Sequence, residues 1–251
     1  MKTLVTANQK GGVGKTSTLV HLAFDAVDRG LKVVIIDLDT QANASYTMQR
    51  YSSGVTASQL FSGNPVALVA PDEAGIALID SDANLANLER ADTNRANRNF
   101  LQAVQQIAGG GFDLCLIDTA PSLGAGLAAA LTAADYVLSP IELEAYSIMG
   151  IQKILKAISN VKLVNSHIRF LGMVPSKFDR RNKRHETYLA ELTKAYPNML
   201  IPTRIGLRSS IADALAAGVP VWKIRKTAAR VAAREMRALA EYVFKKMELI
   251  Q

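Results

Sequence analysis

A glycine-rich stretch, Gly11-Gly12-Val13-Gly14-Lys15-Thr16, constrains the fold of this chain more than any other feature. The apolar run Thr3–Ala7 before it has the composition of a buried strand, and residues 15–29 after it have helical spacing. Backbone N–H groups in such a strand–loop–helix turn converge on a phosphate, a lysine supplies charge, and a hydroxyl can ligate Mg²⁺. The stretch therefore predicts phosphate contacts from Gly11, Gly12, Val13, Gly14, Lys15, Thr16 and Ser17, with Thr16 as a metal ligand.

The stretch departs from the general phosphate-loop pattern G-x-x-x-x-G-K-[ST] at one position. The pattern requires glycine at position 9, where this chain has Gln9, and a second lysine, Lys10, follows. On its own, Lys10 could be a solvated loop charge.

Short apolar runs alternate with helical patterns along the 251 residues. The predicted strands are 3–7, 32–36, 76–79, 114–117, 136–140 and 168–174, and the predicted helices lie near 15–29, 94–108, 124–134, 145–162, 184–196, 207–217 and 227–247. This alternation is typical of βα units. We therefore predict an α/β fold in which residues 1–251 form one P-loop NTPase domain, a mostly parallel twisted sheet with helices on both faces. Residues 52–75 carry no clear pattern.

Carboxylates follow two of the predicted strands. Asp37 and Asp39 come after the run 33–36, and Asp118 follows the run 114–117. Ligands of parallel sheets bind beyond the carboxyl ends of the strands, where Mg²⁺ needs oxygen ligands and an attacking water needs a partner. We assign Asp118 and Asp37 to the metal and Asp39 to the water, although either Asp37 or Asp39 alone could be a turn residue.

These motifs resemble those of the ParA/MinD family of ATPases. Residues 10–16 are similar to the family's deviant Walker A motif, residues 37–41 to its second acidic motif, and residues 116–121 to its Walker B and switch segment. The resemblance spans about 3–225 and is closest to short plasmid ParA-type partition proteins. Thr40 and Ala42 depart from the family's usual proline and glycine.

The resemblance implies a function. It implies weak intrinsic ATP hydrolysis with Mg²⁺, in an ATP-dependent homodimer where Lys10 reaches the partner's nucleotide and takes part in catalysis with Lys15 and Asp39. It also implies adenine contacts near 174–177 and Pro202, and a ParB-type centromere-binding protein that stimulates hydrolysis.

The net charge of +7 is concentrated in the C-terminal third. Residues 167–251 hold 17 Lys and Arg but only 7 Asp and Glu, whereas residues 1–166 have a net charge of −3. The basic residues would suit non-specific contacts with double-stranded DNA phosphates, and the residues assigned to this role are Arg204, Arg225, Lys226 and Arg230. A solvated basic surface is the alternative.

Two other function classes stay open at this point. The C-terminal segment 242–250 raises the alternative of a MinD-like membrane-positioning ATPase, although only two lysines accompany its apolar residues. A small-molecule ATP enzyme would need neither Lys10 nor the basic third. The sequence begins without a signal-peptide pattern and has no membrane span, so we expect a cytoplasmic, nucleoid-associated protein without a membrane partner.

Overall fold

A parallel sheet forms the centre of the molecule in the computed structural model, which describes residues 1–144 and 147–250. Over this part of the chain the sheet has seven strands in the order β3-β4-β2-β5-β1-β6-β7. They are β1 (Lys2–Thr6), β2 (Lys32–Leu38), β3 (Ser52–Thr56), β4 (Gly75–Asp80), β5 (Leu114–Thr119), β6 (Tyr136–Glu142) and β7 (Arg169–Ser176). The predicted α/β fold class is confirmed.

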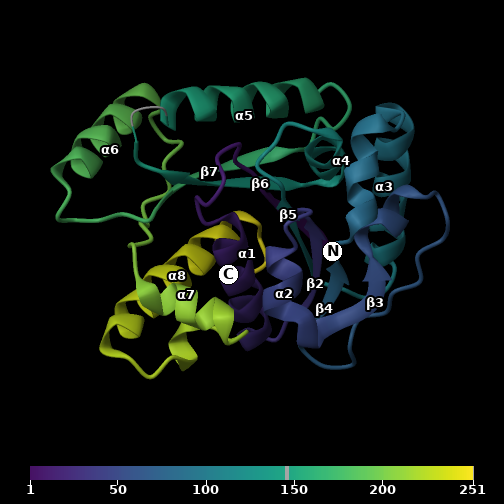
Figure 1. The fold of residues 1–251 in the computed structure, drawn as a ribbon, viewed down its shortest axis with the longest axis horizontal. Helices are drawn as coiled ribbons and strands as arrows, with labels where there is room; N and C mark the ends of the chain where they lie inside the picture. Colours follow the sequence, from purple (N-terminus) through teal and green to yellow (C-terminus); the bar gives the residue numbers. More distant parts are fainter. Residues whose placement is uncertain (145–146, 251) are drawn as a thin grey trace.

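Helices cover both faces of this sheet (Figure 1). They are α1 (Lys15–Asp28), α2 (Asn43–Met48), α3 (Thr93–Ala108), α4 (Ala125–Ala133), α5 (Ser147–Val161), α6 (Lys183–Ala195), α7 (Ser209–Ala216) and α8 (Thr227–Lys246). Short 3₁₀ turns are η1 (Gln49–Tyr51), η2 (Ala57–Phe61), η3 (Ala83–Arg90) and η4 (Val221–Lys223). The predicted helix 145–162 corresponds to α5, and its first two residues lie outside the described residues.

The strands are buried on both faces because successive side chains point in opposite directions. Leu4 packs with residues of α1, α7 and α8, whereas the next residue, Val5, packs with residues of α3, α4 and α5. Ile35 and Ile36 divide in the same way. Continuous apolar runs such as 33–36 are therefore the expected sequence of these strands.

Helix α8 lies against α1, although they stand at opposite ends of the sequence (Figure 1). Arg237 of α8 donates to Asp25 of α1 over 3.0 Å, and the Asp25 carboxylate has no exposed surface. Arg29 donates to the same carboxylate over 2.6 Å. These charged contacts lie at the edge of the apolar packing between the two helices.

A buried histidine makes a second connection between α1 and the C-terminal third. His21 Nδ1 lies 2.6 Å from the Ser17 carbonyl oxygen, and Nε2 accepts from the Val221 N–H over 3.2 Å. This network places the ring proton on Nδ1. Burial lowers the pKa of His21 to about 4, so the ring stays neutral at physiological pH.

The region without a clear sequence pattern contains an edge strand. Residues 52–56 form β3, which pairs with β4 with a shift in register, and all five residues are at most partly buried. The short helix α2, before this strand, was also missing from the predicted elements.

Candidate functional site

The glycine-rich loop joins β1 to α1 at the carboxyl edge of the sheet. Gly12 and Gly14 have φ angles of 74° and 94°, in the left-handed region that favours glycine. A Cβ atom on Gly14 would lie 2.8 Å from the Ser176 hydroxyl oxygen, so the loop also needs glycine for space. No side chain caps the first turn of α1, which leaves its backbone N–H groups available to an anion.

Lys15 is a buried cation without an ion-pair partner among the described residues. Its relative exposure is 6%. Burial lowers the pKa of Lys15 below its ordinary value, and Asp118 and Asp39 offset part of this effect. Because a buried charge is costly without a counter-charge, the site fits an anionic ligand.

Asp118 lies directly behind Thr16. It pairs in register with Asp37 across β5 and β2, and it accepts hydrogen bonds from Thr16 Oγ1 over 2.5 Å and from Thr6 Oγ1 over 3.2 Å. Burial, and then the neighbouring Asp37, raise the pKa of Asp118 to about 7. Two buried carboxyl groups beside a hydroxyl form an oxygen-rich group that fits a divalent cation.

Asp37 uses both carboxylate oxygens to order the turn that follows β2. Its Oδ2 accepts from the Ser45 N–H over 2.8 Å and from the Ser45 hydroxyl over 2.7 Å, and its Oδ1 accepts from the Asp39 N–H over 3.0 Å. Burial raises the pKa of Asp37 above its ordinary value despite these bonds. The structure thus gives Asp37 a positioning contact with Asp39.

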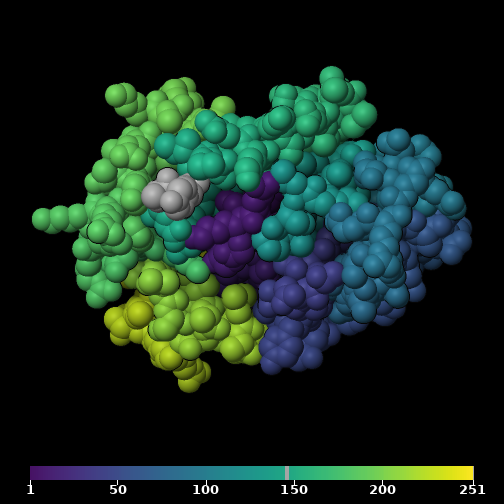
Figure 2. Space-filling view, turned by 45° about the horizontal axis from the view of Figure 1, so that its top comes forward, coloured from purple at the N-terminus to yellow at the C-terminus, as the bar shows by residue number. Residues whose placement is uncertain are grey.

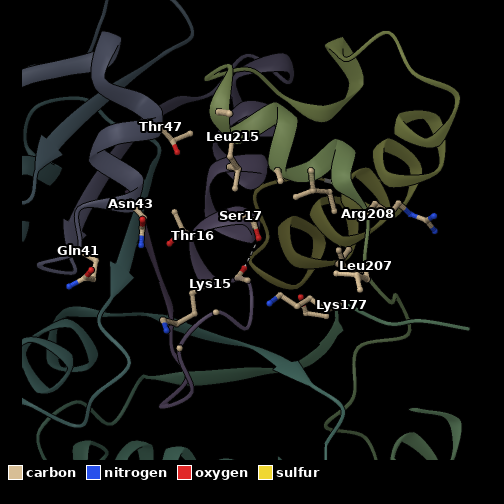
Figure 3. Close-up of a pocket in the computed structure, with 18 of the residues that line it drawn as sticks. Lys15, Thr16, Ser17, Gln41, Asn43, Thr47, Lys177, Leu207, Arg208 and Leu215 are labelled. Atoms are coloured by element: carbon tan, nitrogen blue, oxygen red, sulfur yellow. Dashed lines mark hydrogen bonds between the residues drawn. The ribbon is translucent and has the colours of Figure 1, made fainter. Parts of the chain in front are cut away.

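A cavity of about 600 Å³ opens in front of the glycine-rich loop, a volume within the usual range of small-ligand sites. Its polar end includes Lys15, Thr16, Asp39 and Lys177. Its far wall is apolar and comprises Ile205, Leu207, Ile211, Ala212, Leu215 and Ala216. Figure 3 shows Lys15, Thr16 and Ser17 facing Leu207 and Leu215 across this space, with Gln41, Asn43 and Thr47 at the side.

The apolar wall was not predicted as part of the site. Residues 207–217 were predicted only as a helix, and the adenine contact was placed at Pro202, which is exposed and does not line the cavity. Of the predicted segment 174–177, the structure places Ser176 and Lys177 in the lining. The spacing of Ile211 and Leu215, four residues apart on one helix face, was the available signal.

Lys10 lies in the exposed part of the loop and its side chain turns toward the end of β6. Its Nζ lies 2.8 Å from Glu142 Oε2 and 2.6 Å from Glu144 Oε2. Lys10 does not line the cavity. Figure 2 shows purple N-terminal residues at the surface, with teal residues above them and yellow-green and blue residues below.

The four residues assigned to DNA contact differ in their surroundings. Arg204 contacts Glu186 over 3.4 Å and stacks over Phe178, and Lys226 contacts Asp213 over 2.6 Å. Arg225 and Arg230 have no ion pair among the described residues. They lie near the start of α8, so the structure leaves this part of the basic third free for a polyanion.

The C-terminal apolar residues pack into the core. Val243, Phe244 and Met247 are fully buried in the cluster shared by α1 and α8. This packing occupies the apolar face that a lipid-binding helix would present. Among the described helices, none combines the length and apolar character required to cross a bilayer.

The fold and the loop place the chain in the class of P-loop NTPases. A family model described as "AAA domain" matches residues 1–170. The chain belongs to this family, in its ParA/MinD-type branch.

The chain is 62% identical to "Protein IncC" of Escherichia coli over 259 residues, which cover 100% of this chain and 71% of that protein. It is 30% identical to "Chromosome partitioning protein ParA" of Caulobacter vibrioides, covering 88% of this chain and 86% of that protein. A putative plasmid partition protein from Borrelia burgdorferi, solved bound to AMPPNP, aligns with a TM-score of 0.78 at 22% identity, covering 98% of each chain. The last similarity shows the fold alone.

Proposed function

We propose that this protein is a DNA-partition ATPase, in which an ATP-bound homodimer binds DNA without sequence preference and a centromere-binding partner stimulates hydrolysis. The observation that carries the proposal is the buried, unpaired Lys15 in the glycine-rich loop, beside the Thr16–Asp118 pair. The similarity to IncC and to ParA supports the partition role. In this role the protein acts in the cytoplasm on the nucleoid.

The cavity suits a nucleoside triphosphate in one orientation. Loop N–H groups and Lys15 would hold the phosphates at the polar end, and the apolar wall with Ile205 and Leu207 would cover the base. Thr16 and Asp118 would hold Mg²⁺, which supplies charge neutralisation at the phosphates. Asp37 would keep Asp39 in place through the Asp39 N–H.

Lys10 would complete the site of the second protomer. The exposed loop position allows its side chain to leave Glu142 and Glu144 and reach a nucleotide across a dimer interface. Exposed ion pairs of this kind contribute about 1 kcal/mol or less, so phosphate oxygens can replace the carboxylates. This exchange of carboxylate partners for phosphate oxygens would make dimer formation depend on bound ATP.

Replacement of Asp39 with alanine is expected to leave ATP binding intact and to slow hydrolysis by roughly 100-fold, the lower end of the usual contribution of a positioned base. The reason is that Asp39 lines the cavity beyond the loop and, among the described residues, forms no hydrogen bond or ion pair with Lys15 or Thr16. Single-turnover phosphate release and fluorescent-ATP titration measure the two steps separately. Gln41→Ala, which changes another residue that lines the cavity, is the control for Asp39→Ala. Unchanged turnover in Asp39→Ala would remove Asp39 from the mechanism.

The double variant Arg225→Glu, Arg230→Glu is expected to weaken DNA binding by tenfold or more while ATP turnover stays within about twofold of wild type. Arg225 and Arg230 form no ion pair with a carboxylate in residues 1–144 and 147–250, and losing phosphate contacts also reduces the salt dependence of binding. Filter binding to unrelated duplexes, with ATP, with ADP and without nucleotide, measures the effect. The double variant Lys162→Glu, Lys194→Glu, which changes two exposed lysines away from α8, is the charge-matched control.

Equal DNA affinity in the three nucleotide states would defeat the switch, and equal affinity of the double variant would place the DNA surface elsewhere. Arg204 and Lys226 are the second pair to test, because both must leave an ion pair before contacting phosphate.

A further inference from the structure

An apolar groove lies between α4 and α5, away from the nucleotide cavity. Its volume is about 470 Å³. Leu127, Ala128 and Leu131 of α4 form one wall at helical spacing, and Ala157 and Val161 of α5 form the other. Leu123 lies at the mouth of the groove, with 49% of its surface exposed.

Small side chains keep the groove open. Helix α4 has the sequence AGLAAALTA and contains no charged residue. Besides Leu127 and Leu131, its lining residue is the small Ala128, which forms the floor of the groove. Apolar concave surfaces of this kind are typical of helix-in-groove recognition, where a partner helix inserts its apolar stripe. A flat bilayer surface would not reach the floor of a groove.

The charges at the rim have one sign. Lys153 and Lys156 of α5 are exposed and line the groove together with Asn160, and its lining residues include no carboxylate. Neither lysine has an ion pair among the described residues. A helix with an apolar stripe and acidic flanks would therefore match both the floor and the rim, whereas a basic helix would be repelled.

We propose that the α4–α5 groove docks an acidic amphipathic helix of a protein partner. One residue at the mouth of the groove is close along the chain to a residue of the nucleotide cavity. Leu123 at its mouth is two residues from Pro121, which lines the nucleotide cavity, and a Cβ atom on Gly11 of the phosphate loop would lie 3.8 Å from Pro121 Cγ.

The start of α4 is fixed from the other side by η3. Glu89 Oε1 accepts from the Ala125 N–H over 3.1 Å. Between this fixed point and the end of β5 at Thr119, residues 120–124 are the segment of the chain that contains Leu123. Docking at the groove would thus act on the residues between the metal-binding Asp118 and α4, and this coupling rests on the proposed ATPase function.

An unbiased display library of 16-residue helical peptides, selected on the full chain without nucleotide, tests the chemistry of the occupant. We expect enrichment of sequences with an apolar stripe and acidic flanks. Their affinity, measured by fluorescence anisotropy, should fall roughly tenfold in the double variant Lys153→Glu, Lys156→Glu, since two ion pairs of up to about 1 kcal/mol each are lost.

Two further variants separate docking from stability. Ala128→Gln fills the floor of the groove without adding charge and should also lower the peptide affinity. Lys194→Glu on α6 should leave the peptide affinity unchanged. Thermal unfolding checks that each variant is folded. Enrichment of basic peptides, or equal peptide affinity for the folded groove variants, would overturn the proposal.

ATP turnover is measured separately with the selected peptide. An acceleration in wild type that disappears in the groove variants supports the coupling to the switch segment, and binding without any effect on turnover overturns the coupling. A chain that binds the peptide but not ATP would contradict the proposed function and leave the docking site standing.

Discussion

Replacement of Lys15 with alanine is expected to reduce ATP affinity by roughly 100-fold, the upper range for a lost charge-assisted hydrogen bond. Lys15 is the buried cation at the polar end of the cavity, and it forms no ion pair among the described residues. The triphosphate oxygens would supply the negative charge that pairs with Lys15, so ATP binding depends on this lysine. Isothermal titration with a slowly hydrolysed ATP analogue gives the affinity.

The same substitution should not destabilise the ligand-free protein. Burial lowers the pKa of Lys15, which means that the fold disfavours its charged form. Loss of this charge is therefore expected to leave the unfolding temperature without ATP unchanged or higher, and to remove the rise that ATP gives to wild type. Lys194→Ala, which changes an exposed lysine of α6 outside the cavity, is the control and should retain the affinity. Wild-type affinity in Lys15→Ala would refute the assignment of the phosphate site.

Replacement of Asp25 with alanine is expected to lower the free energy of unfolding by about 3 kcal/mol, the lower end of the range for breaking a buried ion pair. Its carboxylate has no exposed surface and accepts from Arg29 and Arg237. Both arginines would keep a second carboxylate partner, Glu241 and Asp28 respectively, and this limits the loss. Urea unfolding at constant m-value measures it.

Asp28→Ala is the matched comparison, because Asp28 is partly exposed and pairs with the same Arg237. Its effect is expected to be about 1 kcal/mol or less. Equal losses in the two variants would show that burial of Asp25 has no special role between α1 and α8.

The sequence predicted the parts of the site that follow from local pattern. Gly14, Lys15 and Asp118 were predicted because a glycine-rich turn and a carboxylate after an apolar run are readable without tertiary contacts, and the structure places these residues at the same edge of the sheet. Strand β3 was missed because Ser52–Thr56 is a partly exposed edge without an apolar run. Helix α2 was missed because six residues give too little periodicity.

Tertiary pairing was the part that no local pattern could supply. Arg230 and Arg237 lie on the same helix, α8, yet Arg237 contacts α1 and stacks over Trp222 while Arg230 has no ion pair among the described residues. Similarly, no local sequence pattern predicts that Lys10 contacts Glu142 or that residues 205–208 line the cavity. These contacts depend on how distant elements meet at the sheet edge.

The position of β1 in the sheet has a consequence for synthesis on the ribosome. Although β1 precedes the other strands in the chain, its neighbours are β5 and β6, and its residues pair with Leu114 and Tyr136. Helix α1 is covered by α8 and α7 of the C-terminal third, and His21 of α1 accepts a hydrogen bond from the Val221 N–H. A nascent chain therefore carries the glycine-rich loop for most of its elongation without the packing that holds the loop in shape, and the site is completed only when nearly all of the chain has emerged.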